Sequence, residues 1–281
     1  MKGNVVVVDH DSKVIFHMGQ YRKKVAARST AKLIQVLPVY LLELDKKFSL
    51  SDEELVIMSS SQLAQKQHVC VLERLLEKTG IREEDIRISL SAPAGRIAYH
   101  IWSANRGSKR KIYHPCVGNH IAMMLAQREL SGHAKGYEDP DSQVQRWICK
   151  LMAEFCEYPE SMIGITSDGC GVPTYILPME NIAIAYKNIV SHNLRKNQTI
   201  RQAVCCHKQA IWANPRMLEG DGCLSTALSS RKGIIAKTGA GGLLALGMEK
   251  SEYGMLFQSD EEDWDKVANM VDMVLEELED R

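Results

Sequence analysis

Apolar patterns typical of β-strands lie at both ends of the chain, and helical patterns occupy the middle. At the start, the apolar runs 4–9 and 14–18 flank a short polar turn, which predicts a β-hairpin. Three more strands with glycine-rich turns are predicted near the end, at residues 233–237, 243–248 and 253–257. Strands from both termini with helices between them predict an α/β (α+β) fold, in which both chain ends build one mixed sheet surrounded by helices.

Apolar residues recur at helical spacing through most of the middle of the chain. The predicted helices span residues 69–78, 118–130, 142–157, 179–191 and 199–213, and an acidic helix follows at about 261–278. Helical spacing also runs from Thr30 to Lys47, where Pro38 is expected to bend or interrupt the helix. We interpret the apolar run from Leu55 to Met58 as a buried strand, followed by a helix that ends at Gly80.

The size and charge of the chain limit the kind of protein it can be. A length of 281 residues with 45% hydrophobic residues is sufficient for one sizeable core, so we expect residues 1–281 to form a single domain or two intimate lobes. Lys plus Arg and Asp plus Glu both number 35, so no net field attracts nucleic acid or an anionic membrane. A small-molecule substrate is therefore expected.

The start of the chain and its cysteines predict a cytoplasmic protein. The first apolar run, Val5 to Val8, is too brief for a signal peptide and is closed by Asp9. No apolar run approaches the roughly 18 residues that cross a bilayer. Eight cysteines in a chain of this length do not indicate a small disulfide-linked scaffold, so reduced thiols are expected.

Ser29-Thr30-Ala31-Lys32 places a serine and a lysine three residues apart at the start of a predicted helix. Residues at this spacing share one helix face, so the Lys32 amine is able to approach the Ser29 hydroxyl. Burial or a second cation lowers the pKa of a lysine, and a neutral lysine can accept a serine proton. Taken alone, the pattern more often marks a helix cap followed by a solvated lysine.

Two further segments favour a chemical role for this pattern. Lys237-Thr238-Gly239 lies on a predicted strand, and an early Ser-x-x-Lys with a late Lys-Thr-Gly is the order found in serine β-lactamases and penicillin-binding proteins. Ser59-Ser60-Ser61 lies at the end of the predicted buried strand, where a second catalytic serine could face the first. A turn that caps the next helix explains these three serines equally well.

Two loops rich in polar residues and glycine contain the candidate metal ligands. Residues 113–120 include Cys116 and His120, and residues 166–173 include Cys170. Thiolate and imidazole groups bind zinc, yet neither cysteine belongs to a C-x-x-C pair. From spacing alone, buried inert thiols are the default and zinc is the alternative.

Five segments of the chain occur in an order that resembles a known family. They are Ala27-Arg-Ser-Thr-Ala-Lys32, Ser59-Ser-Ser61, Cys116-Val-Gly-Asn-His120, Asp168-Gly-Cys-Gly-Val-Pro173 and Lys237-Thr-Gly-Ala240. In this order they resemble the motifs of the rhizobial-type L-asparaginases, a family with a serine β-lactamase-like fold. The likeness runs from about residue 4 to residue 248.

The resemblance implies hydrolysis of L-asparagine to L-aspartate and ammonia. It implies that Ser29 is the nucleophile, that Lys32 activates it, and that Ser61 and Lys237 form a second serine–lysine pair. Two such pairs could move the protons that amide hydrolysis requires, and backbone donors could stabilise the tetrahedral oxyanion.

The same resemblance assigns roles around the substrate and suggests an assembly. Arg28 and His120 would lie near the bound amino acid, and Asp168 would hold the polar groups of the pocket in place. A backbone carbonyl partner is an equally acceptable role for Arg28. The family likeness also suggests a homodimer.

Zinc is allowed by the resemblance but not required as a cofactor. The family's zinc site uses the cysteines matched by Cys116 and Cys170, together with a lysine where this chain has Asn119. An amide is a poorer zinc ligand than a thiolate or a neutral amine, so the affinity for zinc should be lower here.

Departures from the family pattern leave two alternatives open. Residues 62–67 lack the usual pattern beyond the serine, Ser225 replaces a further family cysteine, and the chain diverges after Gly247. One alternative is a related serine amidohydrolase that acts on glutamine, a lactam or another small amide. The other is a catalytically silent relative that binds a small amino acid or a protein partner.

Overall fold

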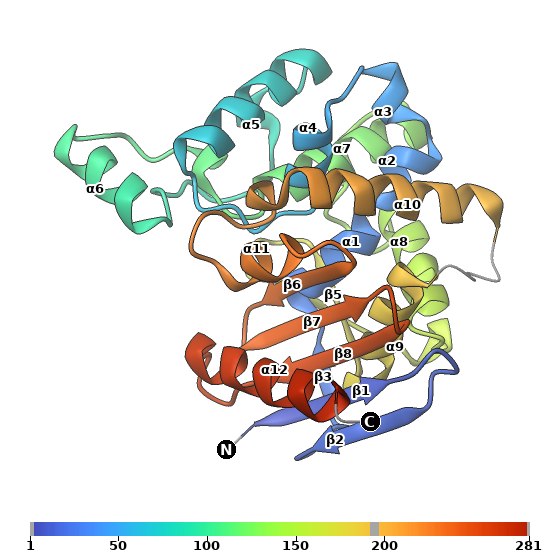
Figure 1. The fold of residues 1–281 in the computed structure, drawn as a ribbon. Coiled ribbons are helices and arrows are strands. Elements are labelled where there is room, and N and C mark those ends of the chain that lie inside the picture. Colours follow the sequence, from blue (N-terminus) through green and yellow to red (C-terminus); the bar gives the residue numbers. More distant parts are fainter. Residues whose placement is uncertain (1–2, 192–196, 280–281) are drawn as a thin grey trace.

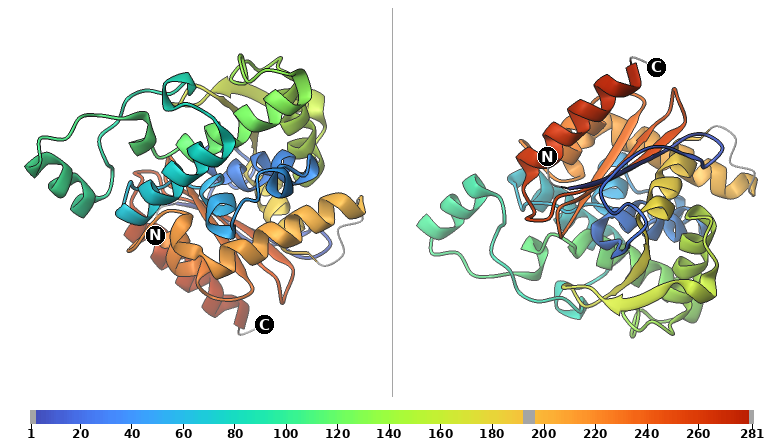
Figure 2. Two further views of the ribbon diagram at one scale, coloured as in Figure 1. Left: turned by 90° about the horizontal axis from the view of Figure 1, so that it is seen from above. Right: turned by 90° about the horizontal axis from the view of Figure 1, so that it is seen from below.

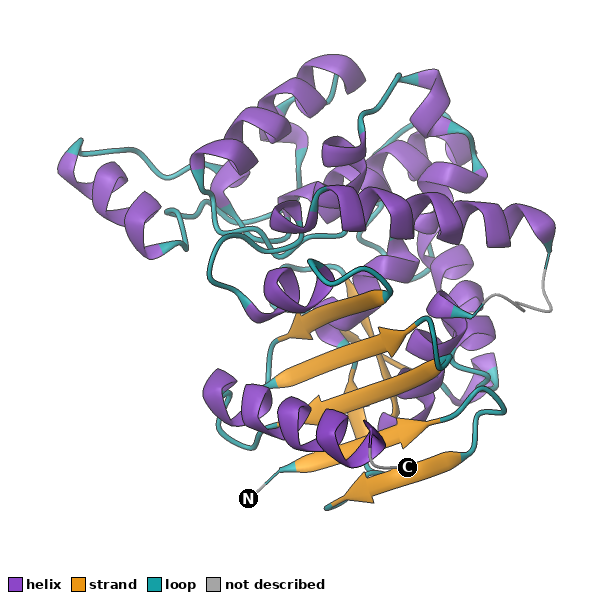
Figure 3. Cartoon of the chain, in the orientation of Figure 1, coloured by secondary structure: helices purple, strands orange, loops and turns teal. Residues whose placement is uncertain are grey.

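The computed structural model describes residues 3–191 and 197–279, with the strands gathered on one side of the helical region (Figure 1, Figure 3). Its larger sheet has five strands in the order β2-β1-β8-β7-β6. These are β1 (Asn4–Val8), β2 (Val14–Met18), β6 (Ile234–Gly239), β7 (Leu243–Met248) and β8 (Tyr253–Gln258). The α/β class and the sheet built from both chain ends are confirmed. Every pairing in this sheet is antiparallel, so the expectation of a sheet of mixed direction is corrected.

Helices cover both faces of the five-stranded sheet, which explains why most residues of its inner strands β1, β7 and β8 are buried. α9 (Met179–Val190) packs on one face, and α12 (Trp264–Glu279) lies along the other (Figure 1, Figure 2). In β1, Val6 and Val8 belong to the main core, whereas Val5 and Val7 belong to the apolar cluster that includes α12. Successive side chains of a strand point to opposite faces, and here both faces are dry.

A second sheet, which the sequence patterns did not predict, joins two of the candidate motifs. Its three strands have the order β3-β5-β4, with β3 (Lys24–Ala26), β5 (Pro173–Pro178) and β4 (Gly164–Ser167). The Ala27 N–H donates to the Tyr175 carbonyl at 2.8 Å, directly before the Ser-x-x-Lys segment. This sheet therefore holds that segment beside the loop that carries Asp168 and Cys170.

The long helices lie where the apolar spacing predicts them. They are α5 (Lys66–Thr79), α7 (Val117–Ser131), α8 (Gln143–Phe155), α9 and α10 (Gln198–Ala213). α5 ends at Gly80, whose φ of 65° lies in the left-handed region that a glycine adopts without strain. The predicted acidic helix near the C-terminus is α12, which begins at Trp264.

The predicted helix from Thr30 to Lys47 is divided into short pieces. A 3₁₀ turn, η1 (Arg28–Ala31), leads into α1 (Lys32–Gln35), α2 (Leu37–Leu41) and α3 (Leu44–Lys47). Pro38 lies in the first turn of α2, where a missing N–H is tolerated. Glu43, with φ of 54°, separates α2 from α3.

The prediction of a strand from Leu55 to Met58 is wrong. Leu55 to Ile57 belong to helix α4 (Asp52–Ile57), and Met58 is its C-terminal cap. Ser51 and Glu54 form a capping box at the start of this helix, in which each side chain accepts a hydrogen bond from the other residue's backbone N–H. The last turn of the helix is fully enclosed, so its apolar run has no polar face to reveal a helical period.

Two short helices complete the fold. α6 (Arg96–Ala104) projects from the body of the molecule and buries none of its residues, whereas α11 (Leu224–Ser229) packs beside β6 (Figure 1). Within residues 3–191 and 197–279, no helix has the length and apolar character needed to cross a bilayer. The eight cysteines all carry free thiols.

Gly118→Ala should lower the free energy of unfolding by about 1–3 kcal/mol or more, because overpacking against backbone has no easy relief. Gly118 lies in α7, and a Cβ there would overlap the carbonyl oxygen of Ile57 in α4. Urea denaturation measures the change. Gly169→Ala is the matched control, since its Cβ would meet no described atom within 4 Å. Equal losses in the two variants would contradict the close approach of α7 to α4.

Candidate active site

The hydroxyl of Ser61 lies between two lysine amines. Lys237 Nζ is 2.9 Å from Ser61 Oγ, and Lys32 Nζ is 3.3 Å from the same oxygen. Lys32 comes from α1 and Lys237 from β6, whereas Ser61 lies in the extended segment between α4 and α5. The Ser61 N–H donates to the Leu218 carbonyl at 2.8 Å, so the segment that contains Leu218 helps to hold the serine backbone in place.

The structure separates the roles of the three adjacent serines. Ser59 Oγ donates to the Val56 carbonyl at 3.0 Å and lies 2.9 Å from Nε2 of the buried His207. Ser60 Oγ is buried and has no partner among the described residues. Only Ser61, of these three, has its hydroxyl beside the lysines. Geometry therefore selects the same serine that the family resemblance selects.

Lys32 reaches further than its own helical turn. Its Nζ donates to the Ser60 carbonyl at 2.6 Å and to Cys116 Sγ at 3.2 Å, in addition to Ser61. Within residues 3–191 and 197–279, no hydrogen bond joins it to the Ser29 hydroxyl. The sequence pattern pairs Ser29 with Lys32, but in the structure Lys32 shares Ser61 with Lys237.

Ser29 is the second residue of η1 and is half-buried. The residue before it, Arg28, has φ of 51°, a conformation that costs energy for a residue with a side chain. The Arg28 N–H donates to Thr174 Oγ1 at 2.9 Å, so β5 holds this strained turn in place. The role of Ser29 as the nucleophile stays a prediction.

The surroundings of Lys237 lower its pKa. Its side chain is fully buried in the protein. Burial lowers the pKa of Lys237 from 10.5 to about 8, against the opposing effect of Glu219, and Lys32 adds to the lowering. A lysine with a pKa near 8 is neutral in part at physiological pH, as a general base requires.

Arg28 and Asp168 form an ion pair at the edge of the site. Arg28 Nη1 donates to Asp168 Oδ1 at 2.7 Å, and the Gly169 N–H donates to the same oxygen at 2.7 Å. The role of Asp168 in holding the polar groups of a substrate pocket stays a prediction. Contact of Arg28 with a substrate stays a prediction.

His120 is fully buried in α7 and is held by a tyrosine. Its Nδ1 lies 2.7 Å from the Tyr137 hydroxyl, which accepts a hydrogen bond from the Arg87 N–H at 2.9 Å. Burial lowers the pKa of His120 to about 3, so the ring is neutral. Nε2 is buried and has no partner among the described residues. Any contact of His120 with a substrate would be that of a neutral ring, not of a cation.

Cys116 and Cys170 lie together, but the residues around them do not complete a zinc site. The Cys170 thiol hydrogen-bonds to Cys116 and, with Lys32, holds the pKa of Cys116 well below its ordinary value. Asn119 Nδ2 donates to the Met58 carbonyl at 3.4 Å. No group of three His, Cys, Asp or Glu side chains in the described part of the chain could hold a metal. Two thiols fall short of the four ligands of zinc.

The sequence patterns missed Glu219, which approaches Lys237 through Thr238. Thr238 Oγ1 donates to Glu219 Oε1 at 2.7 Å and lies 3.4 Å from Lys237 Nζ. Ser225 Oγ accepts the Thr238 N–H at 2.9 Å. The only local signal for Glu219 was an acidic residue followed by a glycine-rich turn, and that pattern does not reveal which strand it faces.

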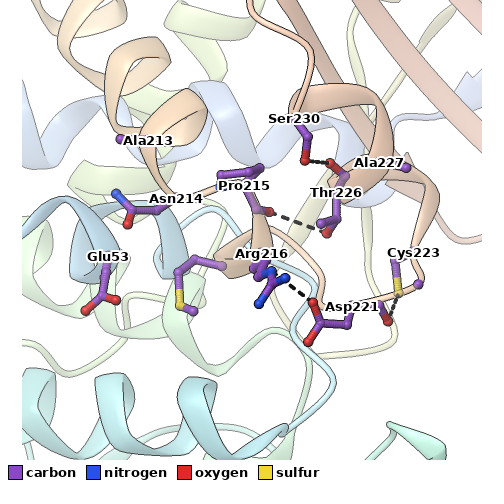
Figure 4. Close-up of a pocket in the computed structure, with 12 residues that line it drawn as sticks. Glu53, Ala213, Asn214, Pro215, Arg216, Asp221, Cys223, Thr226, Ala227 and Ser230 are labelled. Atoms are coloured by element: carbon purple, nitrogen blue, oxygen red, sulfur yellow. Dashed lines mark hydrogen bonds and ion pairs between the residues drawn. The ribbon is translucent and has the colours of Figure 1, made fainter.

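A cavity of about 440 Å³ is lined mainly by residues between 213 and 230 (Figure 4). Arg216 and Asp221, which form an ion pair at 3.1 Å, line it together with Cys223 and Thr226. None of the four predicted catalytic residues is among those that line this cavity.

Comparisons with known proteins place the chain in a family. A family model described as L-asparaginase II matches residues 1–279. No curated protein matches the sequence. A solved structure of a protein from Bacteroides dorei DSM 17855, provisionally described as a beta-lactamase, is similar at 14% identity, covering 92% of this chain and 84% of that chain, with a TM-score of 0.46. Because the family model spans almost the whole length, this chain belongs to the L-asparaginase II family.

Proposed function

We propose that this protein is an amidohydrolase that converts L-asparagine and water into L-aspartate and ammonia. Its membership of the L-asparaginase II family supports the reaction class. The observation that carries the proposal is the Ser61 hydroxyl, which lies 2.9 Å from Lys237 Nζ and 3.3 Å from Lys32 Nζ. A hydroxyl shared by two amines is suited to passing protons during acyl transfer.

In the proposed first half-reaction, Ser29 Oγ attacks the side-chain amide carbon of asparagine. The Ser29 proton enters the group formed by Lys32, Ser61 and Lys237, of which Lys237 has the lowered pKa. A lysine ammonium of this group then gives a proton to the departing nitrogen. Ammonia leaves, and the aspartyl group remains as an ester on Ser29.

In the second half-reaction, water attacks this ester and the same three residues accept the water proton. The Ser29 oxygen recovers a proton as L-aspartate leaves, so the enzyme returns to its starting state. No step requires a metal or a redox partner. The Arg28 guanidinium, held by Asp168, is a cation at the edge of the site that can pair with the carboxylate of an amino acid.

Release of ammonia from a set of small amides tests the proposal. Purified protein is given L-asparagine, L-glutamine, a simple lactam and an unsubstituted aliphatic amide, each with and without a metal chelator. We expect turnover of L-asparagine above the others, and the same rate with chelator. Strong turnover of glutamine or the lactam with none of asparagine would assign another amidohydrolase activity. No turnover of any amide would favour a silent binding protein.

The rate should rise with pH as Lys237 loses its proton. Its pKa is lowered to about 8, and only the neutral amine can accept a proton from Ser61. Below this pKa, kcat/KM for L-asparagine should therefore fall by about tenfold for each pH unit, because the neutral fraction falls by that factor. A profile measured from pH 5.5 to 9 checks this. A rate that stays flat from pH 6 to 8 would contradict the assignment of Lys237 as a base.

A further inference from the structure

Glu219 lies one side chain away from Lys237, and Thr238 connects them. Glu219 Oε1 accepts a hydrogen bond from Thr238 Oγ1 at 2.7 Å. Glu219 Oε2 is buried and has no partner among the described residues. Leu218, its neighbour in the chain, accepts the Ser61 N–H, so the same segment also fixes the serine.

The hydrogen bonds around Thr238 have only one consistent direction. A carboxylate can only accept, so the single hydroxyl proton of Thr238 points to Glu219. Ser225 Oγ lies 3.1 Å from Thr238 Oγ1 and must therefore be the donor in that contact. Both electron pairs of Thr238 Oγ1 then face donors, which are Ser225 and the Lys237 amine at 3.4 Å.

The same reasoning fixes the direction of the Lys237 amine. Nζ lies 2.9 Å from the Thr238 carbonyl, which can only accept, and 3.4 Å from Thr238 Oγ1, whose proton is already used. A neutral amine has two N–H bonds and one electron pair. With both N–H bonds pointing to Thr238, the electron pair faces Ser61 Oγ at 2.9 Å.

We propose that Glu219 is a positioning residue that acts through Thr238, directing the free electron pair of Lys237 toward the Ser61 hydroxyl. Its part in catalysis rests on the proposed function, whereas its effect on Lys237 does not. Glu219 touches no reacting atom. It makes Thr238 an acceptor toward the amine and supplies a negative charge near it.

The charged and titratable groups that act on Lys237 come from several elements. Lys32 of α1 lowers its pKa, whereas Glu219, Cys116 at the start of α7, and Cys223 before α11 each raise it. Of the three that raise it, Glu219 has the largest effect. Removal of this carboxylate should therefore favour the neutral lysine.

The first arm of the test needs no turnover. The Cε signal of Lys237 is followed by NMR in protein labelled with ¹³C-lysine, and its absence from Lys237→Met assigns it. Glu219→Gln keeps an acceptor for Thr238 but removes the charge, so the pKa of Lys237 should fall by roughly one unit. Asp221→Asn is the matched control, because Asp221 is two residues away and pairs with Arg216 outside the site (Figure 4). Equal pKa values of Lys237 in Glu219→Gln and Asp221→Asn would overturn the proposal.

The second arm separates orientation from charge. Thr238→Val keeps the Glu219 carboxylate but removes the hydroxyl, so kcat should fall roughly 10- to 100-fold with little change in KM. Thr238→Ser, which restores the hydroxyl, should recover most of this loss. In Glu219→Gln, the acid limb of the kcat/KM profile should move to lower pH by the same amount as the NMR titration. A Thr238→Val variant with the kcat of the wild type would contradict the proposal that Glu219 acts on Lys237 through Thr238.

The two arms also distinguish this inference from the proposed function. If the wild type hydrolyses no amide, the asparaginase proposal fails, and the NMR titration still decides whether Glu219 acts on Lys237. If the wild type is active but Glu219→Gln titrates and behaves like Asp221→Asn, only the positioning role fails. If Glu219→Gln does not fold, the kcat of Thr238→Val still tests the proposal, because a kcat equal to that of the wild type would contradict it.

Discussion

Ser29→Ala is expected to abolish ammonia release from L-asparagine, with a loss in kcat of roughly 10⁴-fold or more. The variant leaves both lysines and Ser61 in place, so protons can still move, but no oxygen is left to form the ester. Coupled ammonia assays measure the rate. Mass spectrometry of enzyme quenched during turnover should show an adduct of one aspartyl group, and only in active protein.

Ser230→Ala is the control for loss of a hydroxyl near this part of the fold. Ser230 Oγ donates to the Thr226 carbonyl at 2.7 Å, and Ser230 lines the cavity that contains none of the predicted catalytic residues (Figure 4). Removal of its hydroxyl should therefore leave turnover unchanged. Retention of full activity by Ser29→Ala would refute the nucleophile. An adduct mapped to Ser61 would make Ser61 the nucleophile in place of Ser29. This is the specific alternative, because the Ser61 hydroxyl lies beside both lysine amines.

Lys237→Met should lower kcat roughly 10²- to 10⁴-fold, the range attributed to a general acid or base. At the same time the protein should become no less stable to heat. Burial lowers the pKa of Lys237, so the ammonium form is disfavoured at this position in the folded protein. Methionine fills similar volume without a charge. Thermal unfolding at pH 7, with steady-state kinetics on the same samples, measures both effects.

Lys208→Met provides the opposite result as a control. Lys208 is also buried, but its Nζ forms an ion pair with Glu249 at 2.7 Å, away from the candidate site. Removal of this lysine leaves the partly buried carboxylate of Glu249 without its partner, which destabilises the folded protein. We expect Lys208→Met to lose stability and keep its kcat. Loss of both properties in Lys237→Met would identify Lys237 as structural instead of catalytic.

The cysteine pair lies beside one of the two lysines of the candidate site. Cys116 and Cys170 lie together, Lys32 Nζ donates to Cys116 Sγ, and Asn119 Nδ2 donates to the Met58 carbonyl. The thiols are thus part of the polar surroundings of Lys32. The amide survey with and without chelator tests whether these thiols bind a metal that the reaction needs. A rate that falls with chelator would show that it does.

The sequence by itself determined the elements whose signals are local. The apolar runs and turns of the terminal segments predicted the strands of the five-stranded sheet, because a strand buried on both faces is apolar along most of its length. Helices α5, α7, α8, α9 and α10 followed from apolar spacing, and Gly80 marked a helix end through its left-handed conformation. The motifs at Ser29, Ser61 and Lys237 were also visible in the sequence, and the family model later matched the whole region.

Tertiary structure alone decided how these motifs meet. The enclosed last turn of α4 has no polar face, so the sequence shows no helical period there and its apolar run resembles a strand. The spacing of Ser29 and Lys32 suggested a pair, but contacts between distant segments direct Lys32 to Ser61 and Cys116. Glu219 gave no recognisable pattern, because its effect depends on a hydrogen bond across 19 residues of chain to Thr238. Local patterns report the conformation of neighbouring residues, whereas the position of a proton depends on which distant groups the fold brings within 3 Å.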